Sequence, residues 1–189
     1  MPPFDFSDFP ILETERLRLR RITTDDKATW LAIFQNDEVR RYLIDFEDNP
    51  IFEDMDGIFD WTKMIFKQKS GIRWAITLKP DDTMIGSCGF HVYSEHHRSA
   101  EIGYELSHGH WRKGIMSEAV DAVLDFCFEQ LAVHRIEADV TVGNEASAGL
   151  LKSLGFTHEG TWRDKVYVRG QFFSLWQFGL LEGEYPQKS

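Results

Sequence analysis

The chain has 189 residues, of which 42% are hydrophobic and 14% aromatic, a content that excludes a disordered chain and supports a sizeable core. At about 100–200 residues per domain, this length predicts a single domain over 1–189 with its core at about 12–181. The 21 Lys and Arg against 31 Asp and Glu give a net charge of −10, and this deficit of cations argues against nucleic acid as the main ligand.

The sequence predicts a soluble, cytoplasmic protein. No stretch approaches the roughly 18 apolar residues of a membrane span, and residues 1–10 lack the charged-then-apolar order of a signal peptide. Cys88 and Cys127 are too few for a disulfide framework, and both lie in apolar stretches typical of small core residues. We therefore expect neither a membrane partner nor a nucleic-acid partner.

The first third of the chain predicts one strand and three helices. Apolar and charged residues alternate around Leu17 and Leu19, which is typical of a strand with one solvent-exposed face. The polar residues at 23–26 are suited to cap the N-terminus of a helix. The expected order is a strand at 12–22, a helix after 23–26, a short helix at 37–43, an acidic loop at 45–55 and a helix at 58–66.

The rest of the chain predicts strands interrupted by two helices. The strand, helix and strand between residues 100 and 142 imply a right-handed crossover, so these two strands run parallel in a largely antiparallel sheet. The fold class is therefore mixed α/β (α+β). The expected order is strands at 74–78, 84–93 and 100–107, a helix at 117–131, a strand at 135–142, a helix at 145–154 and a hairpin of strands at 161–168 and 171–181.

Residues 111–119, which read WRKGIMSEA, form the most informative segment. The helix that begins there presents unpaired N–H groups and a positive dipole end. Gly114 allows a ligand to approach the backbone, while Arg112, Lys113 and Ser117 add two charges and a hydroxyl. This pattern fits a pyrophosphate cradle, or equally an ordinary turn before a helix. Neither the P-loop nor the dinucleotide fingerprint is present, which disfavours nucleotide hydrolysis and hydride transfer.

A second informative segment runs from residue 142 to residue 156. Asn144 suits a helix N-cap, and Ser147 falls within the first helical turn. Two interpretations stand side by side. Either Asn144 only caps the helix and Ser147 is solvated, or both side chains face the opening where two parallel strands separate.

Together these segments resemble the GNAT acetyltransferase superfamily, over nearly the whole chain from residue 12 to residue 181. The superfamily's acetyl-CoA signature, Q/R-x-x-G-x-G/A, is matched in frame by residues 111–116, although the first and last positions depart from it. The form W-x-K-G-x-M-[ST]-E-A is similar to that of the Rim-type protein N-terminal acetyltransferases. So are the opening ETERLRLR at 13–20 and the pair Asn144 and Ser147 followed by Leu-Gly-Phe at 154–156.

The resemblance implies a GNAT-like fold, in which a mixed, mostly antiparallel sheet has a splayed parallel pair and helices on both faces. It implies acetyl-CoA as the donor, a primary amine as the acceptor, and a possible homodimer, since dimers are common among relatives. Backbone groups of Glu105, Leu106 and Ser107 would pair with the pantetheine arm, Asn144 would bond the same arm, and Ser147 would lie near the thioester sulfur. The pyrophosphate would be held by Arg112, Lys113, Gly114, Ile115, Met116 and Ser117.

Amine acetylation needs a deprotonated amine, a stabilised carbonyl oxygen and a protonated leaving thiolate. Direct attack needs no covalent intermediate, so neither cysteine need be a nucleophile, and backbone N–H groups near Leu106 would polarise the carbonyl. Ser147 is the candidate acid for the thiolate. Glu101, at the start of its strand, is the candidate base, and Glu105 is a second candidate on the same face by period two. Two alternatives remain. A chain of water molecules could take the proton in place of a carboxylate, or the carboxylate could have no role in catalysis and only pair with a cation near the strand.

Five histidines raise the question of a metal, but they lack partner residues at ligand spacing, so we expect no metal site; one of them would rather relay a proton. They are His91, His96, His97, His108 and His110.

The predicted function is N-acetyl transfer to a protein N-terminal α-amino group. A small-molecule amine as acceptor and a non-catalytic acyl-CoA-binding module are the alternatives. Some aromatic residues of the first helices and the last hairpin should line the acceptor pocket. Ser174 stands in that hairpin where relatives often have Asp, which leaves the acceptor open.

Overall fold

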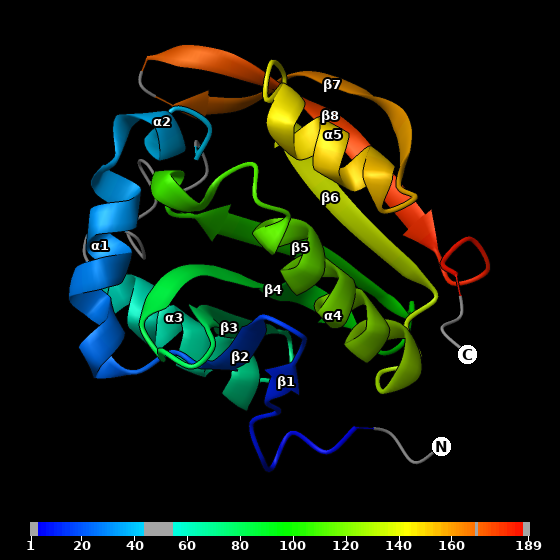
Figure 1. Cartoon of the computed structure of the whole chain (residues 1–189). Coiled ribbons are helices and arrows are strands. Elements are labelled where there is room, and N and C mark those ends of the chain that lie inside the picture. Colours follow the sequence, from blue (N-terminus) through cyan, green and yellow to red (C-terminus); the bar gives the residue numbers. More distant parts are fainter. Residues whose placement is uncertain (1–3, 44–54, 169, 187–189) are drawn as a thin grey trace.

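The computed structural model describes residues 4–43, 55–168 and 170–186. Their strands form one eight-stranded sheet in the order β1-β2-β3-β4-β5-β6-β8-β7 (Figure 1). This mixed, mostly antiparallel sheet confirms the predicted fold class. The strands are β1 (Leu12–Glu13), β2 (Leu17–Arg21), β3 (Ile72–Leu78), β4 (Met84–Ser94), β5 (Ser99–Leu106), β6 (Arg135–Thr141), β7 (Thr157–Val168) and β8 (Gln171–Leu181).

The predicted helices are present, with shifted ends. The helix expected at 117–131 begins earlier, at Ile115, because Gly114 takes a left-handed conformation at its N-cap. The acidic loop expected at 45–55 lies outside the described residues apart from its last residue, which begins α3. No described helix is long and apolar enough to cross a membrane. The helices are α1 (Lys27–Gln35), α2 (Asp37–Arg40), α3 (Met55–Lys67), α4 (Ile115–Glu129) and α5 (Glu145–Ser153).

The prediction of one strand over 12–22 is wrong, since the segment forms two antiparallel strands, β1 and β2. The chain reverses between them through a tight turn in which the Thr14 N–H donates to the Leu17 carbonyl over 3.0 Å. The residues of this turn include neither Gly nor Pro, so the sequence lacks the usual signal of a reversal.

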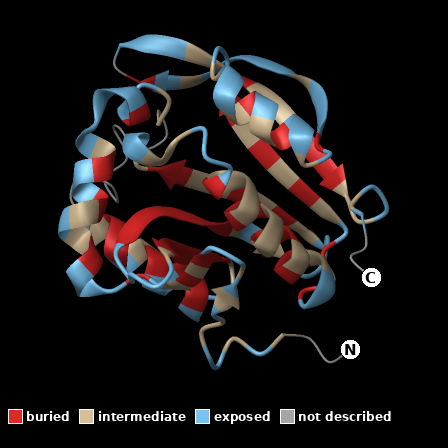
Figure 2. Ribbon diagram, in the orientation of Figure 1, coloured by how far each residue is buried: buried red, intermediate tan, exposed pale blue. Residues whose placement is uncertain are grey.

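Helices cover both faces of the sheet, as the resemblance implied. Trp74 and Ile76 on β3 belong to the larger buried cluster, which also contains Val120 and Leu124 of α4. Ala75, between them in sequence, belongs to a second cluster with Trp30 of α1 and Phe59 of α3. Alternate residues of a strand point to opposite faces, so α4 packs on one face while α1 and α3 pack on the other. The central strands are accordingly buried in Figure 2, and the outer hairpin is largely exposed.

The expected parallel pair is present, and it separates. Strands β5 and β6 pair only at Ser99 with Arg135, Ala100 with Ile136 and Glu101 with Glu137. Beyond this point β5 continues to Leu106 and β6 continues to Thr141, and the two strands diverge (Figure 1). Strand edges that face such an opening carry N–H and C=O groups ready to pair with an extended ligand.

Candidate functional site

The orientation of the β5 backbone decides which of its groups face the opening. The Ser107 N–H donates to the Ile85 carbonyl over 2.8 Å, on the β4 side. Neighbouring residues of an antiparallel strand direct their backbone groups to opposite sides, so Glu105 also faces β4, while Tyr104 and Leu106 face the opening. The geometry therefore supports Leu106 as a binding residue and argues against the backbones of Glu105 and Ser107. It adds Tyr104, which the sequence analysis missed.

The loop before α4 has the geometry of an anion-binding helix start. Gly114 has φ +72° as the N-cap residue of α4, a conformation that L side chains rarely adopt. Ile115, Met116 and Ser117 form the first helical turn, whose N–H groups lack intrahelical partners. These N–H groups, with the helix dipole, suit a phosphate. Lys113 instead turns back, and its Nζ donates to the Gly109 carbonyl over 2.7 Å.

This loop is braced from the other end of the chain. The Glu118 carboxylate, in the first turn of α4, accepts hydrogen bonds from Thr14 Oγ1 and from the backbone N–H and Nε of Arg16. Arg16 Nη1 also donates to the Lys113 carbonyl over 2.9 Å. Both segments belong to the motifs of the resemblance, but their contact spans about a hundred residues and cannot be read from spacing.

The N-terminus of α5 carries a hydroxyl pair. The Asn144 side chain accepts from the Ser147 N–H over 3.2 Å, which confirms Asn144 as the N-cap. Ser147 Oγ lies 2.8 Å from the hydroxyl of Tyr104, so the pair connects α5 with β5. Burial raises the pKa of Tyr104, so its hydroxyl stays protonated near neutral pH. The pair thus provides a proton donor beside the separated strands.

Glu105 is the centre of a buried network on the opposite face of β5. It is 4% exposed, accepts from Trp30 Nε1 over 2.7 Å, and also contacts the Ser87 hydroxyl and the Arg73 guanidinium. A carboxylate so enclosed and so fully bonded has an anchoring role. This environment argues against Glu105 as the base.

Glu101 has a different environment. Its carboxylate lies 3.4 Å from His91 Nε2, and both side chains are about 30% exposed. It also occupies the last residue pair before β5 and β6 separate. The candidate base therefore reaches solvent where the strands diverge, with a histidine beside it.

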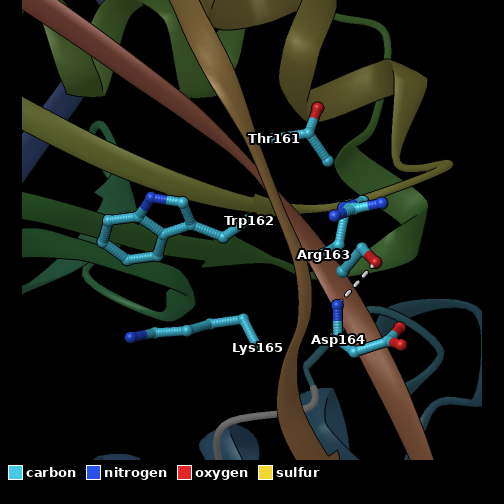
Figure 3. A pocket seen from close by; sticks show the side chains of 6 residues that line it. Thr161, Trp162, Arg163, Asp164 and Lys165 are labelled. Atoms are coloured by element: carbon cyan, nitrogen blue, oxygen red, sulfur yellow. Dashed lines mark hydrogen bonds between the residues drawn. The ribbon is translucent and has the colours of Figure 1, made fainter.

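An open depression of about 830 Å³ lies on the last hairpin, lined by residues of β7 and Ser174 of β8 (Figure 3). Strand β7 bulges there, and the Asp164 N–H donates to Ser174 Oγ over 3.0 Å. Trp162 and Lys165 lie on one side of the strand, with Lys165 Nζ 4.4 Å from the ring centre. Ser174 therefore has a local role in shaping the bulge.

Neither cysteine has the environment of a reactive thiol. Both are buried, and burial raises the pKa of Cys88 to about 12 and raises that of Cys127 further. Among the described residues, no group of His, Cys, Asp or Glu is arranged to hold a metal ion. The expectation that the protein needs no metal stays a prediction.

Known proteins share both the sequence and the fold. The model of the acetyltransferase (GNAT) domain matches residues 16–157. Uncharacterized N-acetyltransferase YoaA of Bacillus subtilis (strain 168) is 42% identical over 162 residues, which cover 86% of this chain and 91% of that protein. The [ribosomal protein uS5]-alanine N-acetyltransferase of Escherichia coli (strain K12) is 29% identical, with 85% of each chain covered.

A solved structure extends the likeness to three dimensions. Spermidine N-acetyltransferase from Vibrio cholerae, in complex with CoA and spermine, superposes with a TM-score of 0.78 at 23% identity, over 91% of this chain and 99% of that one. At this identity the likeness shows the fold alone. With the sequence matches, it places the chain in the GNAT acetyltransferase family, as an acetyl-CoA-dependent N-acetyltransferase.

Proposed function

We propose that the protein transfers the acetyl group of acetyl-CoA directly to the α-amino group at a protein N-terminus. The observation that carries the donor site is the short β5–β6 pairing, which ends at Glu101 and Glu137 although both strands continue. The pantetheine arm would lie in the opening as an added strand, and the pyrophosphate would lie at the start of α4.

On the donor side, the Tyr104 backbone would pair with the arm, and the Asn144 amide would bond it as well. The Leu106 carbonyl already accepts from Trp111 Nε1 over 2.8 Å, which leaves the Leu106 N–H for the thioester. The pyrophosphate would rest against the N–H groups that follow Gly114, within the proposed set Arg112, Lys113, Gly114, Ile115, Met116 and Ser117.

On the acceptor side, the ammonium loses a proton toward Glu101, and the neutral amine attacks the thioester carbonyl carbon. The carbonyl oxygen gains negative charge and is stabilised by the Leu106 N–H, which faces the opening. As the C–S bond breaks, the amine nitrogen gives its second proton to solvent water, and the thiolate takes the proton of the Ser147 hydroxyl. Ser147 in turn takes the proton of Tyr104, and water reprotonates Tyr104 at the end of the cycle.

The choice of a protein N-terminus rests on relatives, since the uS5-alanine N-acetyltransferase aligns over 85% of both chains. A small polyamine is the second candidate for the acceptor, and the negative charge near the site favours it. Glu101 lies directly opposite Glu137, and Asp139 follows on the same face of β6, on a protein of net charge −10. Arg135 pairs with Glu137 on that face, so the attraction of a polycation would come from Glu101, Asp139 and the net charge.

The donor site is tested by calorimetric titration with acetyl-CoA. The wild type should bind, Gly114→Trp should not, and Gly183→Trp should bind normally, since a Cβ at Gly183 meets nothing within 4 Å. A folded wild type that does not bind acetyl-CoA would contradict the proposal.

The acceptor is tested by CoA thiol release with three probes: a peptide with a free α-amino group, the same peptide N-terminally acetylated, and spermidine. Release with the free peptide alone supports the proposal. Release with spermidine alone favours the polyamine. Tight acetyl-CoA binding without release from any probe would favour the binding module.

A further inference from the structure

The Tyr104 side chain reaches from β5 to the start of α5, on the face of the sheet that α4 and α5 cover. Its backbone lies three residues beyond Glu101, where the pairing with β6 ends, and its hydroxyl lies 2.8 Å from Ser147 Oγ. Because α5 follows β6 in the chain, this hydrogen bond connects the two sides of the opening between the strands. We call the Tyr104 ring, held in place by this bond, the Tyr104 wall.

The surroundings of the Tyr104 wall are apolar and closed. Ile102 and Leu106 of β5, Ala138 of β6 and Ala148 of α5 are between 2% and 7% exposed. All four belong to the larger buried cluster, against which Tyr104 packs. Protein interiors are packed so densely that they leave few voids larger than a water molecule. A carbon chain that enters this face from the opening must therefore displace the ring.

The opposite face of the opening is polar. Glu101 of β5 is partly exposed there, and Asp139 of β6 lies on the same face and accepts from Gln177 Nε2 over 2.6 Å. An alkyl chain is stabilised by apolar surroundings, whereas a carboxylate that it deprives of water is destabilised. The proposed path of the amine also enters from this face. An alkyl chain on the donor is thus left with the face of the Tyr104 wall.

The proposed chemistry places the acyl group beside this wall. Ser147 Oγ, as the acid for the thiolate, must come within hydrogen-bond reach of the thioester sulfur. The same oxygen lies 2.8 Å from the Tyr104 hydroxyl. The acyl group on that sulfur therefore lies next to the Tyr104 ring.

We propose that the Tyr104 wall limits the length of the acyl group, admitting acetyl and excluding butyryl and longer chains. The inference rests on the proposed function, because it uses the proposed donor site, and it names the class of acyl donor. A methyl group fits in front of the ring, but each further methylene must push the ring into the buried cluster. In a tight apolar site, one methylene typically changes the selectivity about 10–200-fold.

The test measures the Kd of acetyl-CoA and of butyryl-CoA by calorimetry, with no amine present. The wild type should bind butyryl-CoA at least about 10-fold more weakly than acetyl-CoA. Tyr104→Ala removes the ring but leaves the backbone that pairs with the arm, so the ratio of the two Kd values should fall close to one. The ratio of kcat/KM for the two donors, measured with the amine that the wild type acetylates, should change in the same direction.

Three further variants separate the ring from other effects. Tyr104→Phe keeps the ring and should keep a Kd ratio close to that of the wild type. Tyr104→Leu keeps an apolar contact with the cluster, so it serves if Tyr104→Ala does not fold, and its ratio should fall part of the way. Tyr167→Ala is the matched control and should keep the wild-type ratio, since the Tyr167 ring is 61% exposed on β7 and contacts Phe172.

Three results would overturn the inference: a wild type that binds both donors equally, a folded Tyr104→Ala or Tyr104→Leu with the wild-type ratio, or a Tyr104→Phe that loses selectivity as fully as Tyr104→Ala. A change in Tyr167→Ala as large as that in Tyr104→Ala would also overturn it. A wild type that binds acetyl-CoA selectively but acetylates no amine would contradict the proposed function and still support the Tyr104 wall.

Discussion

At the scale of single residues, two glutamates on one face of β5 show how surroundings set a role. Glu105 is enclosed and bonded by Trp30, Ser87 and Arg73. Glu101 keeps contact with solvent and with one histidine. Periodicity places both on the same face but says nothing about which of them is closed off.

Glu105→Gln should destabilise the fold strongly. The substitution keeps the shape but leaves the buried Arg73 cation without its counter-charge, a change that typically costs about 3–5 kcal/mol. Urea unfolding would measure the loss. Glu101→Gln is the matched control, expected to change the free energy of unfolding by about 0–1 kcal/mol because its partner is half-exposed. Equal effects of the two substitutions would refute the anchoring role of Glu105.

Tyr104→Phe should slow turnover without weakening donor binding. The hydroxyl that it removes lies 2.8 Å from Ser147 Oγ and stays protonated because burial raises its pKa. We expect kcat, followed by CoA thiol release, to fall about 10–100-fold. Tyr93→Phe serves as the control, since the Tyr93 ring packs against Phe90 on β4. An unchanged kcat in Tyr104→Phe would exclude this hydroxyl from the proton path.

At the scale of elements, the start of α4 depends on the hairpin of β1 and β2. Glu118 in its first turn is bonded by Thr14 and Arg16, and Arg16 also bonds the loop carbonyl of Lys113. A helix N-terminus that is proposed to hold a phosphate needs a fixed position, and these hydrogen bonds supply it.

Glu118→Gln should therefore weaken both the fold and acetyl-CoA binding, in a pH-dependent way. Burial would raise the pKa of Glu118, but the hydrogen bonds from Thr14 and Arg16 outweigh it and hold the pKa below its ordinary value of 4.5. Because the folded pKa is lowered, this stabilisation is present above about pH 4.5 and is lost as the pH falls through the folded pKa.

Wild type and Glu118→Gln should differ by about 1–3 kcal/mol at neutral pH. This difference should narrow below about pH 4.5, as urea unfolding across pH would show. If the difference in free energy of unfolding stays constant across pH, the charge of Glu118 does not cause the stabilisation.

The elements themselves could largely be predicted, because periodicity and the residues at turns are local signals. The turn between β1 and β2 was missed because its residues offer no such signal. For the candidate site, motifs named Gly114, Asn144 and Ser147. Tyr104 and Arg73 were not assigned, because their importance arises from contacts with residues distant in sequence, Ser147 and Glu105.

At the scale of the whole molecule, the net charge of −10 acts on any charged acceptor. If a polyamine is acetylated, its kcat/KM should fall several-fold between roughly 10 mM and 200 mM salt, since the Debye length shrinks from about 30 Å to below 10 Å. A peptide whose only cation is its α-ammonium should respond much less. Equal salt dependence of the two acceptors would exclude electrostatic steering.

The short pairing of β5 and β6 divides the sheet into two panels, β1 to β5 and β6 to β8, joined by three residue pairs. An extended co-substrate in that seam would act as a removable strand of the protein. Each turnover would then complete the sheet when the donor enters and open it again when CoA leaves. The bound co-substrate would thus complete the secondary structure at the seam. The contact between the two panels would become stronger when the donor binds and weaker when CoA leaves.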